Sequence, residues 1–187
     1  MARWSVSLVN SPVNPIRIPA VSNQMSTTRT MYVLRHTKSS WDDETLSDYD
    51  RPLAARGLRD GKRLARYIAE QNLHPDVVLC SSARRTQETL AQIAPSLGAP
   101  AVRMLDELYG ADVADVIALV HQLDNAYTSV LVIGHNPCLA ELAQPNEKFP
   151  TGALATLRWD AENWEDLRPG EAEVVARVTP KELPDPS

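Results

Sequence analysis

The stretch TMYVLRHTKSS, residues 30–40, passes from a run of aliphatic, aromatic and β-branched residues into basic and polar ones. The same pattern occurs in VVLCSSARRT at 77–86 and in SVLVIGHNP at 129–137. Each apolar run has the length and composition of a buried strand. Because ligands bind beyond the carboxyl ends of parallel strands, the polar residues that follow these runs are predicted to meet at one edge of a sheet.

Between and after these runs, the spacing of apolar residues predicts the remaining elements. Helices are predicted over 55–72, 83–94 and 113–123. Further strands are predicted over 101–104, 153–159 and 172–178. A short helix capped by Asn136, with Pro137 in its first position, is also expected. The alternation predicts an α/β fold: a three-layer α/β/α sandwich with a mostly parallel, mixed central sheet.

The ends of the chain are predicted to lie outside a single folded domain over residues 29–180. Residues 1–28 are rich in Ser, Asn and Pro, and we interpret them as a disordered or mis-started extension, with Met25 or Met31 as an alternative start. The tail Pro180–Ser187 contains three prolines and is expected to be coil, so residues 181–187 are predicted to be flexible.

Composition narrows the class of protein. The chain has 187 residues and a net charge of −5, which disfavours nucleic acid as the main partner. No apolar run approaches the roughly 18 residues that span a bilayer, so no membrane partner is expected. The two widely spaced cysteines form neither a disulfide framework nor a zinc motif. We therefore expect a cytoplasmic protein, and a monomer.

The three polar segments carry two histidines and several arginines. His36 and Arg35 follow the first strand, Arg84 and Arg85 open the second helix, and His135 follows a later strand. Guanidinium groups and helix N-termini both favour anions. On these grounds alone, the sequence predicts a phosphate pocket.

Six stretches resemble the histidine phosphatase, or phosphoglycerate mutase-like, superfamily, and in particular its small SixA-type phosphohistidine phosphatase branch. These stretches are LRHTKSSWDD at 34–43, DYDRPLAARG at 48–57, LCSSARRTQET at 79–89, ELYGA at 107–111, VIGHNP at 132–137 and FPTGALA at 149–155. The resemblance covers roughly residues 30–180. It implies the minimal form of the superfamily fold, a phosphatase activity, and no metal or other cofactor.

The resemblance also implies roles for individual residues. His36 matches the nucleophile that takes the phosphoryl group, and Arg35 matches the first phosphate-binding arginine. The register Ser-x-x-x-Arg-x-x-x-Thr from Ser81 makes Arg85 the second arginine. His135 matches the second pocket histidine, which is expected to be protonated. The expected substrate-binding set is Arg35, Arg85, His135, Lys38, Ser39 and Asn136.

A proton donor for the leaving group is less sharply defined. Glu107, in the Glu-Leu-Tyr segment, is the first candidate for a general acid, and Asp42, Asp43 and Glu44 are alternatives. A phosphate ester expels an alkoxide that needs a proton. Phosphohistidine expels an imidazole from a labile P–N bond, so a dedicated acid matters less there.

Two features depart from the pattern of the branch. Thr37 stands where the branch usually has Ala, so its side chain either crowds the pocket or contacts phosphate. The stretch Leu139–Lys148 is shorter than usual, which would open one wall of the site.

The leading function is a metal-independent phosphatase acting on protein phosphohistidine through a phosphohistidine intermediate. The alternatives are a small-molecule phosphomonoesterase and a non-catalytic phosphate-binding module.

Overall fold

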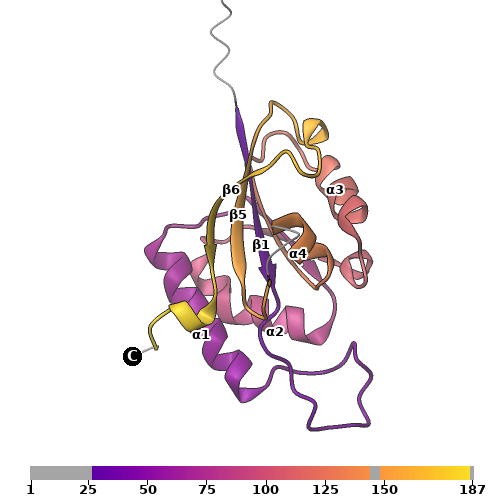
Figure 1. Cartoon of the computed structure of the whole chain (residues 1–187), viewed down its shortest axis with the longest axis vertical. Coiled ribbons are helices and arrows are strands. Elements are labelled where there is room, and N and C mark those ends of the chain that lie inside the picture. Colours follow the sequence, from indigo (N-terminus) through magenta and orange to yellow (C-terminus); the bar gives the residue numbers. More distant parts are fainter. Residues whose placement is uncertain (1–26, 144–147, 186–187) are drawn as a thin grey trace, which may run out of the picture.

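The computed structural model describes residues 27–143 and 148–185, and these form one six-stranded sheet between two layers of helices (Figure 1). The strands are β1 (Thr28–Arg35), β2 (Val77–Ser81), β3 (Ala101–Leu105), β4 (Ser129–Gly134), β5 (Leu154–Asp160) and β6 (Glu173–Val178). Their order is β3-β2-β4-β1-β5-β6. The first four are mutually parallel and β5 is antiparallel to both its neighbours, which confirms the mixed, mostly parallel sheet.

The helices are α1 (Ala55–Glu70), α2 (Arg84–Ile93), α3 (Val113–His121) and α4 (Cys138–Ala143). Short 3₁₀ helices cover Ala94–Ser96, Asp106–Leu108, Trp164–Asp166 and Pro180–Glu182. Alternate residues of the parallel strands pack on opposite layers. For example, Leu34 belongs to the core under α1 and α2, and Val33 to the core under α3 and α4. The predicted three-layer sandwich is confirmed.

The spacing of residues in 55–72 predicts a buried stripe of Leu58, Gly61, Leu64, Ala65 and Ile68, and the observed face of α1 differs from it at Leu58. Leu58 is 40% exposed, whereas Gly57 and Asp60 are buried. The helix is turned so that Gly57 faces the backbone carbonyl of Lys38, where an added Cβ would lie 2.1 Å from the oxygen. A glycine at this position therefore lets α1 approach the segment that follows β1.

Both ends of the domain differ from expectation by a few residues. Strand β1 begins at Thr28, so it includes the last residue of the predicted extension; residues 1–26 lie outside the described chain. The coil expected for the tail is wrong over Pro180–Glu182, which form a 3₁₀ helix. Thr179 and Glu182 cap this helix reciprocally, and Pro180 is buried.

None of the helices over residues 27–143 and 148–185 combines the length and the apolar composition that a membrane span requires.

Candidate active site

The edge of the sheet at the carboxyl ends of β1, β2 and β4 gathers the predicted site. These three strands are neighbours, in the order β2-β4-β1. His36 therefore follows β1 beside His135, which follows β4, and their ring centroids are 5.2 Å apart. Ser81 ends β2 at the same edge. The topology thus brings together residues that are up to 99 positions apart in the sequence.

The ring of His36 has a defined orientation. Its Nδ1 lies 2.7 Å from the Thr37 carbonyl oxygen, which can only accept, so Nδ1 carries the proton. The other nitrogen, Nε2, keeps its lone pair and accepts a 3.3 Å hydrogen bond from Arg85 Nε. Burial lowers the pKa of His36 to about 3, helped by His135, Arg85 and Arg35 and opposed by the bond to Thr37. At neutral pH this ring is a neutral imidazole with Nε2 available as a nucleophile.

His135 is held by two partners. Its Nε2 lies 2.9 Å from Ser81 Oγ, and its Nδ1 lies 3.2 Å from Arg85 Nη2. Because Arg85 can only donate, Nδ1 accepts and Nε2 donates to Ser81. Burial and Arg85 lower the pKa of His135 to about 4, although Asp48 opposes this. Without a bound anion His135 is therefore neutral; a phosphate dianion beside the ring would raise this pKa toward the protonated form that the sequence predicts for phosphoryl transfer.

Arg85 connects both histidines. Its side chain is almost fully buried, and its Nε and Nη2 reach His36 and His135, as described above. Its neighbours in the Ser-x-x-x-Arg-x-x-x-Thr register contribute as well: Ser81 contacts His135, and Thr89 Oγ1 accepts from the backbone N–H of Thr37 at 3.1 Å. The sequence pattern alone predicts no role for Ser81 or Thr89, although their spacing places them in the same register as Arg85.

Arg35 and Asn136 share one partner. Arg35 Nη1 donates to the Phe149 carbonyl at 2.8 Å, and Asn136 Nδ2 donates to the same oxygen at 2.9 Å. Asn136 therefore does not cap the helix that follows, and that helix begins at Cys138 rather than Pro137. The buried Nε of Arg35 and Oδ1 of Asn136 have no hydrogen-bond partner among the described residues. The free Nε of Arg35 suits an anionic ligand.

The side chain of Thr37 contacts α2. It is fully buried, and its hydroxyl lies 3.3 Å from Thr89 Oγ1 on that helix. Crowding of the pocket and contact with phosphate, the two alternatives that the sequence leaves open, stay predictions. The other departure, Leu139–Lys148, falls partly on residues 144–147, outside the described chain.

Lys38 and Ser39, which follow Thr37, anchor the loop between β1 and α1. Lys38 is exposed, and its carbonyl accepts the Ala54 N–H at 2.9 Å. Ser39 is buried and forms an isolated antiparallel bridge with Leu53. Among the described residues, no hydrogen bond or ion pair joins the side chain of either residue to the two histidines, and their part in substrate binding stays a prediction.

The carboxylates proposed as a general acid are exposed side chains, on the loop after β1 and on a 3₁₀ helix. Glu107 is exposed in the 3₁₀ helix Asp106–Leu108, and no hydrogen bond or ion pair of the described residues joins it to the pocket. Glu44 is exposed, and Asp42 and Asp43 line a separate groove of about 350 Å³ beside the loop that follows β1.

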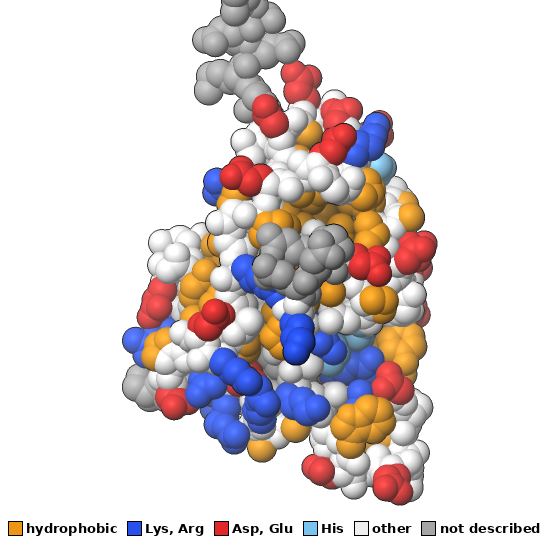
Figure 2. Space-filling model, in the orientation of Figure 1, with side chains coloured by type: hydrophobic (Ala, Val, Ile, Leu, Met, Phe, Trp, Pro, Cys, Tyr) orange, Lys and Arg blue, Asp and Glu red, His pale blue; other side chains and the backbone are white. Residues whose placement is uncertain are grey.

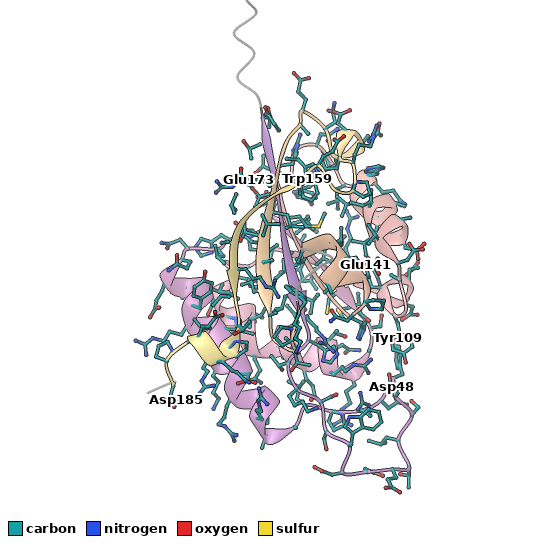
Figure 3. The ribbon with its side chains drawn as sticks, in the orientation of Figure 1. Asp48, Tyr109, Glu141, Trp159, Glu173 and Asp185 are labelled. Carbon is teal, nitrogen blue, oxygen red and sulfur yellow. The ribbon has the colours of Figure 1, made fainter. Side chains whose placement is uncertain are left out.

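The carboxylate that does reach the pocket is Asp48, which the sequence did not single out. Its Oδ2 lies 3.0 Å from Arg85 Nη2 and accepts a 2.9 Å hydrogen bond from the hydroxyl of Tyr109. Figure 3 shows Asp48 and Tyr109 together below the sheet. Tyr109 also lies edge-on to His135, with ring centroids 5.5 Å apart.

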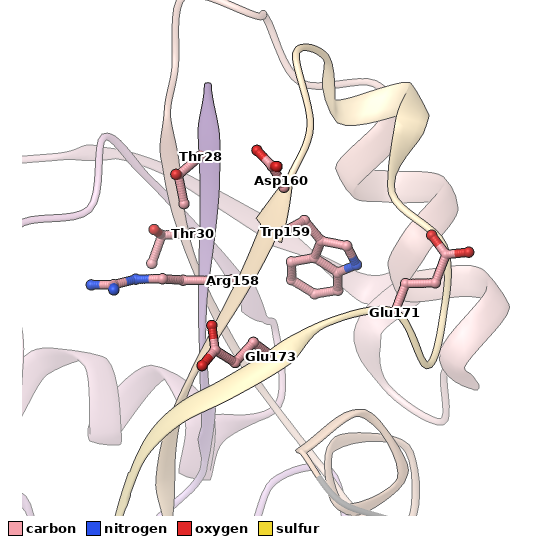
Figure 4. Close-up of a pocket in the computed structure, with 7 residues that line it drawn as sticks. All are labelled: Thr28, Thr30, Arg158, Trp159, Asp160, Glu171 and Glu173. Atoms are coloured by element: carbon pink, nitrogen blue, oxygen red, sulfur yellow. The ribbon is translucent and has the colours of Figure 1, made fainter. Parts of the chain in front are cut away.

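A groove larger than the one beside Asp42 and Asp43 lies at the opposite end of the sheet from the histidines (Figure 4). Its volume is about 730 Å³, and it is lined by Thr28, Thr30, Arg158, Trp159, Asp160, Glu171 and Glu173. Three of these residues are acidic and one is basic, which disfavours a phosphate. By contrast, Lys and Arg side chains gather over the lower half of the molecule, on the side of α1 (Figure 2).

Comparison with known proteins agrees with this geometry. A family model described as histidine phosphatase superfamily (branch 1) matches residues 31–116. An uncharacterized protein of Mycobacterium tuberculosis is 36% identical over 163 residues, which cover 79% of this chain and all of that protein. Phosphohistidine phosphatase SixA of Escherichia coli is 31% identical over 139 residues, which cover 70% of this chain and 85% of SixA. The chain belongs to the histidine phosphatase superfamily, in its SixA-like branch.

The fold of this histidine phosphatase also matches solved structures of the branch. The protein histidine phosphatase SixA in complex with tungstate is 28% identical, with a TM-score of 0.70, and the match covers 82% of this chain and 98% of that one. The protein is thus a phosphatase enzyme that acts on a phosphate-bearing substrate.

Proposed function

We propose that this phosphatase transfers a phosphoryl group to Nε2 of His36 and then to water, without a metal ion. The orientation of the His36 ring carries the proposal, because the bond from Nδ1 to the Thr37 carbonyl leaves Nε2 unprotonated, with its lone pair accepting only a long, 3.3 Å hydrogen bond from Arg85 Nε that an incoming phosphoryl group would replace. Phosphoryl transfer depends mainly on positioning and on stabilising charge at the equatorial oxygens. Arg35, Arg85 and His135 supply donors for those oxygens.

The two steps balance without another reactant. The lone pair of His36 Nε2 bonds to phosphorus as the bond to the leaving group breaks, and the leaving group keeps that electron pair. A water oxygen then bonds to phosphorus, the P–N bond breaks and its electrons return to Nε2. Both water protons stay on the phosphate product, which leaves His36 neutral and singly protonated at Nδ1.

We propose protein phosphohistidine as the substrate, in the cytoplasm. The state of the nearby carboxylates supports this choice: no hydrogen bond or ion pair of the described residues joins the exposed Glu107 to the histidines, and Asp48 is paired with two arginines. An alkoxide leaving group needs a proton in the transition state, whereas the imidazole of phosphohistidine leaves readily. The similarity to a phosphohistidine phosphatase of Escherichia coli also supports it. A small phosphate ester is the alternative.

Hydrolysis of p-nitrophenyl phosphate in the presence of EDTA tests the mechanism. His36→Ala should lose at least about 10³-fold in kcat, whereas His74→Ala, which changes an exposed histidine outside the site, should not change it. Rapid quenching should trap an acid-labile, alkali-stable phosphoenzyme. Activity that survives His36→Ala would exclude this nucleophile. A phosphohistidine-bearing protein compared with small esters then ranks the substrates, and binding without any turnover would favour a phosphate-binding module.

A further inference from the structure

Asp48 places a carboxylate at the mouth of the pocket. Besides its contacts with Arg85 and Tyr109, its Oδ1 lies 3.0 Å from Arg51 Nη2, and its backbone oxygen accepts from Arg85 Nη1 at 2.5 Å. Its side chain is 48% exposed, whereas that of Arg85 is only 6% exposed. The carboxylate is therefore fixed in place and still open to an incoming molecule.

These contacts keep Asp48 ionised. Partial burial favours the neutral acid, but the Tyr109 hydroxyl and the guanidiniums of Arg85 and Arg51 outweigh it, so the pKa of Asp48 lies below its ordinary value. An ionised carboxylate cannot donate a proton to a leaving group. Its effect on a substrate is electrostatic.

The position of Asp48 relates it to the leaving group. Arg85 Nη2 lies between Asp48 Oδ2 and His135 Nδ1, so the carboxylate adjoins the place where the phosphoryl oxygens are bound. His36 is only 7% exposed and lies deeper. In-line transfer puts the leaving group opposite the attacking Nε2 of His36, toward the open side of the site. We place the anion of Asp48 on that side, because its side chain is far more exposed than those of His36 and Arg85 and it contacts the same guanidinium that reaches Nε2.

We propose that Asp48 sets the specificity of the site by charge, favouring phosphoryl groups carried on neutral or cationic leaving groups and disfavouring anionic ones. This inference rests on the proposed function, since it assumes that the phosphoryl group lies against His36. The protonated imidazole of phosphohistidine is a cationic group of the favoured kind. A phosphorylated hydroxy acid, with a carboxylate next to the ester, is of the disfavoured kind.

Two phosphonates that cannot be hydrolysed test this directly. 2-Aminoethylphosphonate carries an ammonium group and phosphonoacetate carries a carboxylate, and calorimetry gives the Kd of each. The wild type should bind the ammonium compound more tightly. Asp48→Asn should shrink that preference by about tenfold, because Coulomb interactions between unit charges a few ångströms apart have this size at a partly exposed site.

Matched variants separate charge from structure. Asp50→Asn removes the same charge from the same loop, at an exposed residue whose side chain contacts Ser47, and should leave the ratio of the two Kd values unchanged. Asp48→Glu should keep the wild-type ratio. If Asp48 only orients Arg85, Asp48→Asn will weaken both ligands alike and the ratio will stay constant, which overturns the inference.

The failure of this inference differs from the failure of the proposed function. Inorganic phosphate serves as the reference ligand. If phosphate binds and p-nitrophenyl phosphate is hydrolysed through His36, a constant ratio refutes only the role of Asp48. If the activity survives His36→Ala, the proposed mechanism falls whatever the ratio. The wild-type preference should also shrink as salt is added, so an inverted or salt-independent preference counts against Asp48 even if a variant fails to fold.

Discussion

Replacement of Gly57 by alanine should damage the active site from a distance. Gly57 lies in the first turn of α1, and an added Cβ would lie 2.1 Å from the Lys38 carbonyl oxygen. Real Cβ atoms essentially never come within 3.0 Å of such an atom, so the Lys38 backbone must move by about 1 Å. Lys38 is two residues from His36, and a shift of this size at a reacting group can cost on the order of 10²-fold in rate.

The stability of the variant follows from opposing effects. Alanine favours the helix by about 1 kcal/mol relative to glycine. Overpacking against a backbone atom costs about 1–3 kcal/mol, and the bond between the Lys38 carbonyl and the Ala54 N–H contributes about 1 kcal/mol more when it is lost. We expect a net loss of about 2 kcal/mol, which lowers Tm by roughly 4–8 °C in a protein of this size.

Thermal unfolding and the kcat/KM for p-nitrophenyl phosphate measure the two effects. Gly61→Ala is the matched control, because it lies on the same helix and its added Cβ would meet the side chain of Gln92 at 2.8 Å instead of the loop after β1. The control should lose stability with much less loss of activity. The reasoning is refuted if Gly57→Ala keeps the wild-type Tm and kcat/KM, or if Gly61→Ala loses as much activity.

Three further predictions follow from single contacts. Arg85→Lys should lower kcat/KM by at least about 10²-fold with the fold intact by circular dichroism, because one ammonium cannot contact both histidines at once; a loss of less than tenfold would contradict this. Thr37→Val removes the hydroxyl that faces Thr89 and should cost about 1 kcal/mol in chemical denaturation with activity within a few-fold, whereas a large loss of activity would place that hydroxyl on the substrate. In NMR titrations, His36 should titrate near pH 3 and His135 near pH 4. Because the unfolded chain binds these two protons near pH 6.5, the free energy of unfolding should decrease as the pH drops from about 6.5 toward 4. In the His135→Gln variant, which lacks one of the two groups, that free energy should decrease less steeply with falling pH.

The architecture could be predicted because it depends on local patterns. The strands before Arg35, Ser82 and His135 are short apolar runs, and each was placed within two residues of its observed bounds. The errors came from tertiary contacts. The orientation of α1 is set by how closely Gly57 approaches the loop after β1, and Pro180, the first residue of the last 3₁₀ helix, is buried.

The arrangement of the site was predictable for residues at strand ends and much less so for residues on loops. His36 and His135 meet because β1 and β4 are adjacent and parallel. The alternation of elements predicts that the strands are parallel and end at one edge, but not that these two are neighbours. Asp48 lies 61 residues from Tyr109 and 37 from Arg85, and only the folded loop brings them together. No periodicity in the sequence reports such a contact. Glu107 is favoured by its Glu-Leu-Tyr segment alone. That segment fixes the position of the residue along the chain, but not where its side chain points in the folded protein.

The electrostatics of the pocket explain why its histidines are neutral before substrate binds. Arg35 and Arg85 already supply two positive charges, which Asp48 balances only in part, and burial adds a penalty for a further cation. In the proposed mechanism a phosphoryl dianion would reverse this balance, so that His135 would gain a proton as charge accumulates on the phosphoryl oxygens. His36, whose Nδ1 proton is held by the Thr37 carbonyl, would stay unprotonated at Nε2 and use that lone pair to bond to phosphorus. On this proposal, one buried guanidinium in contact with both rings allows two similar histidines to take different roles.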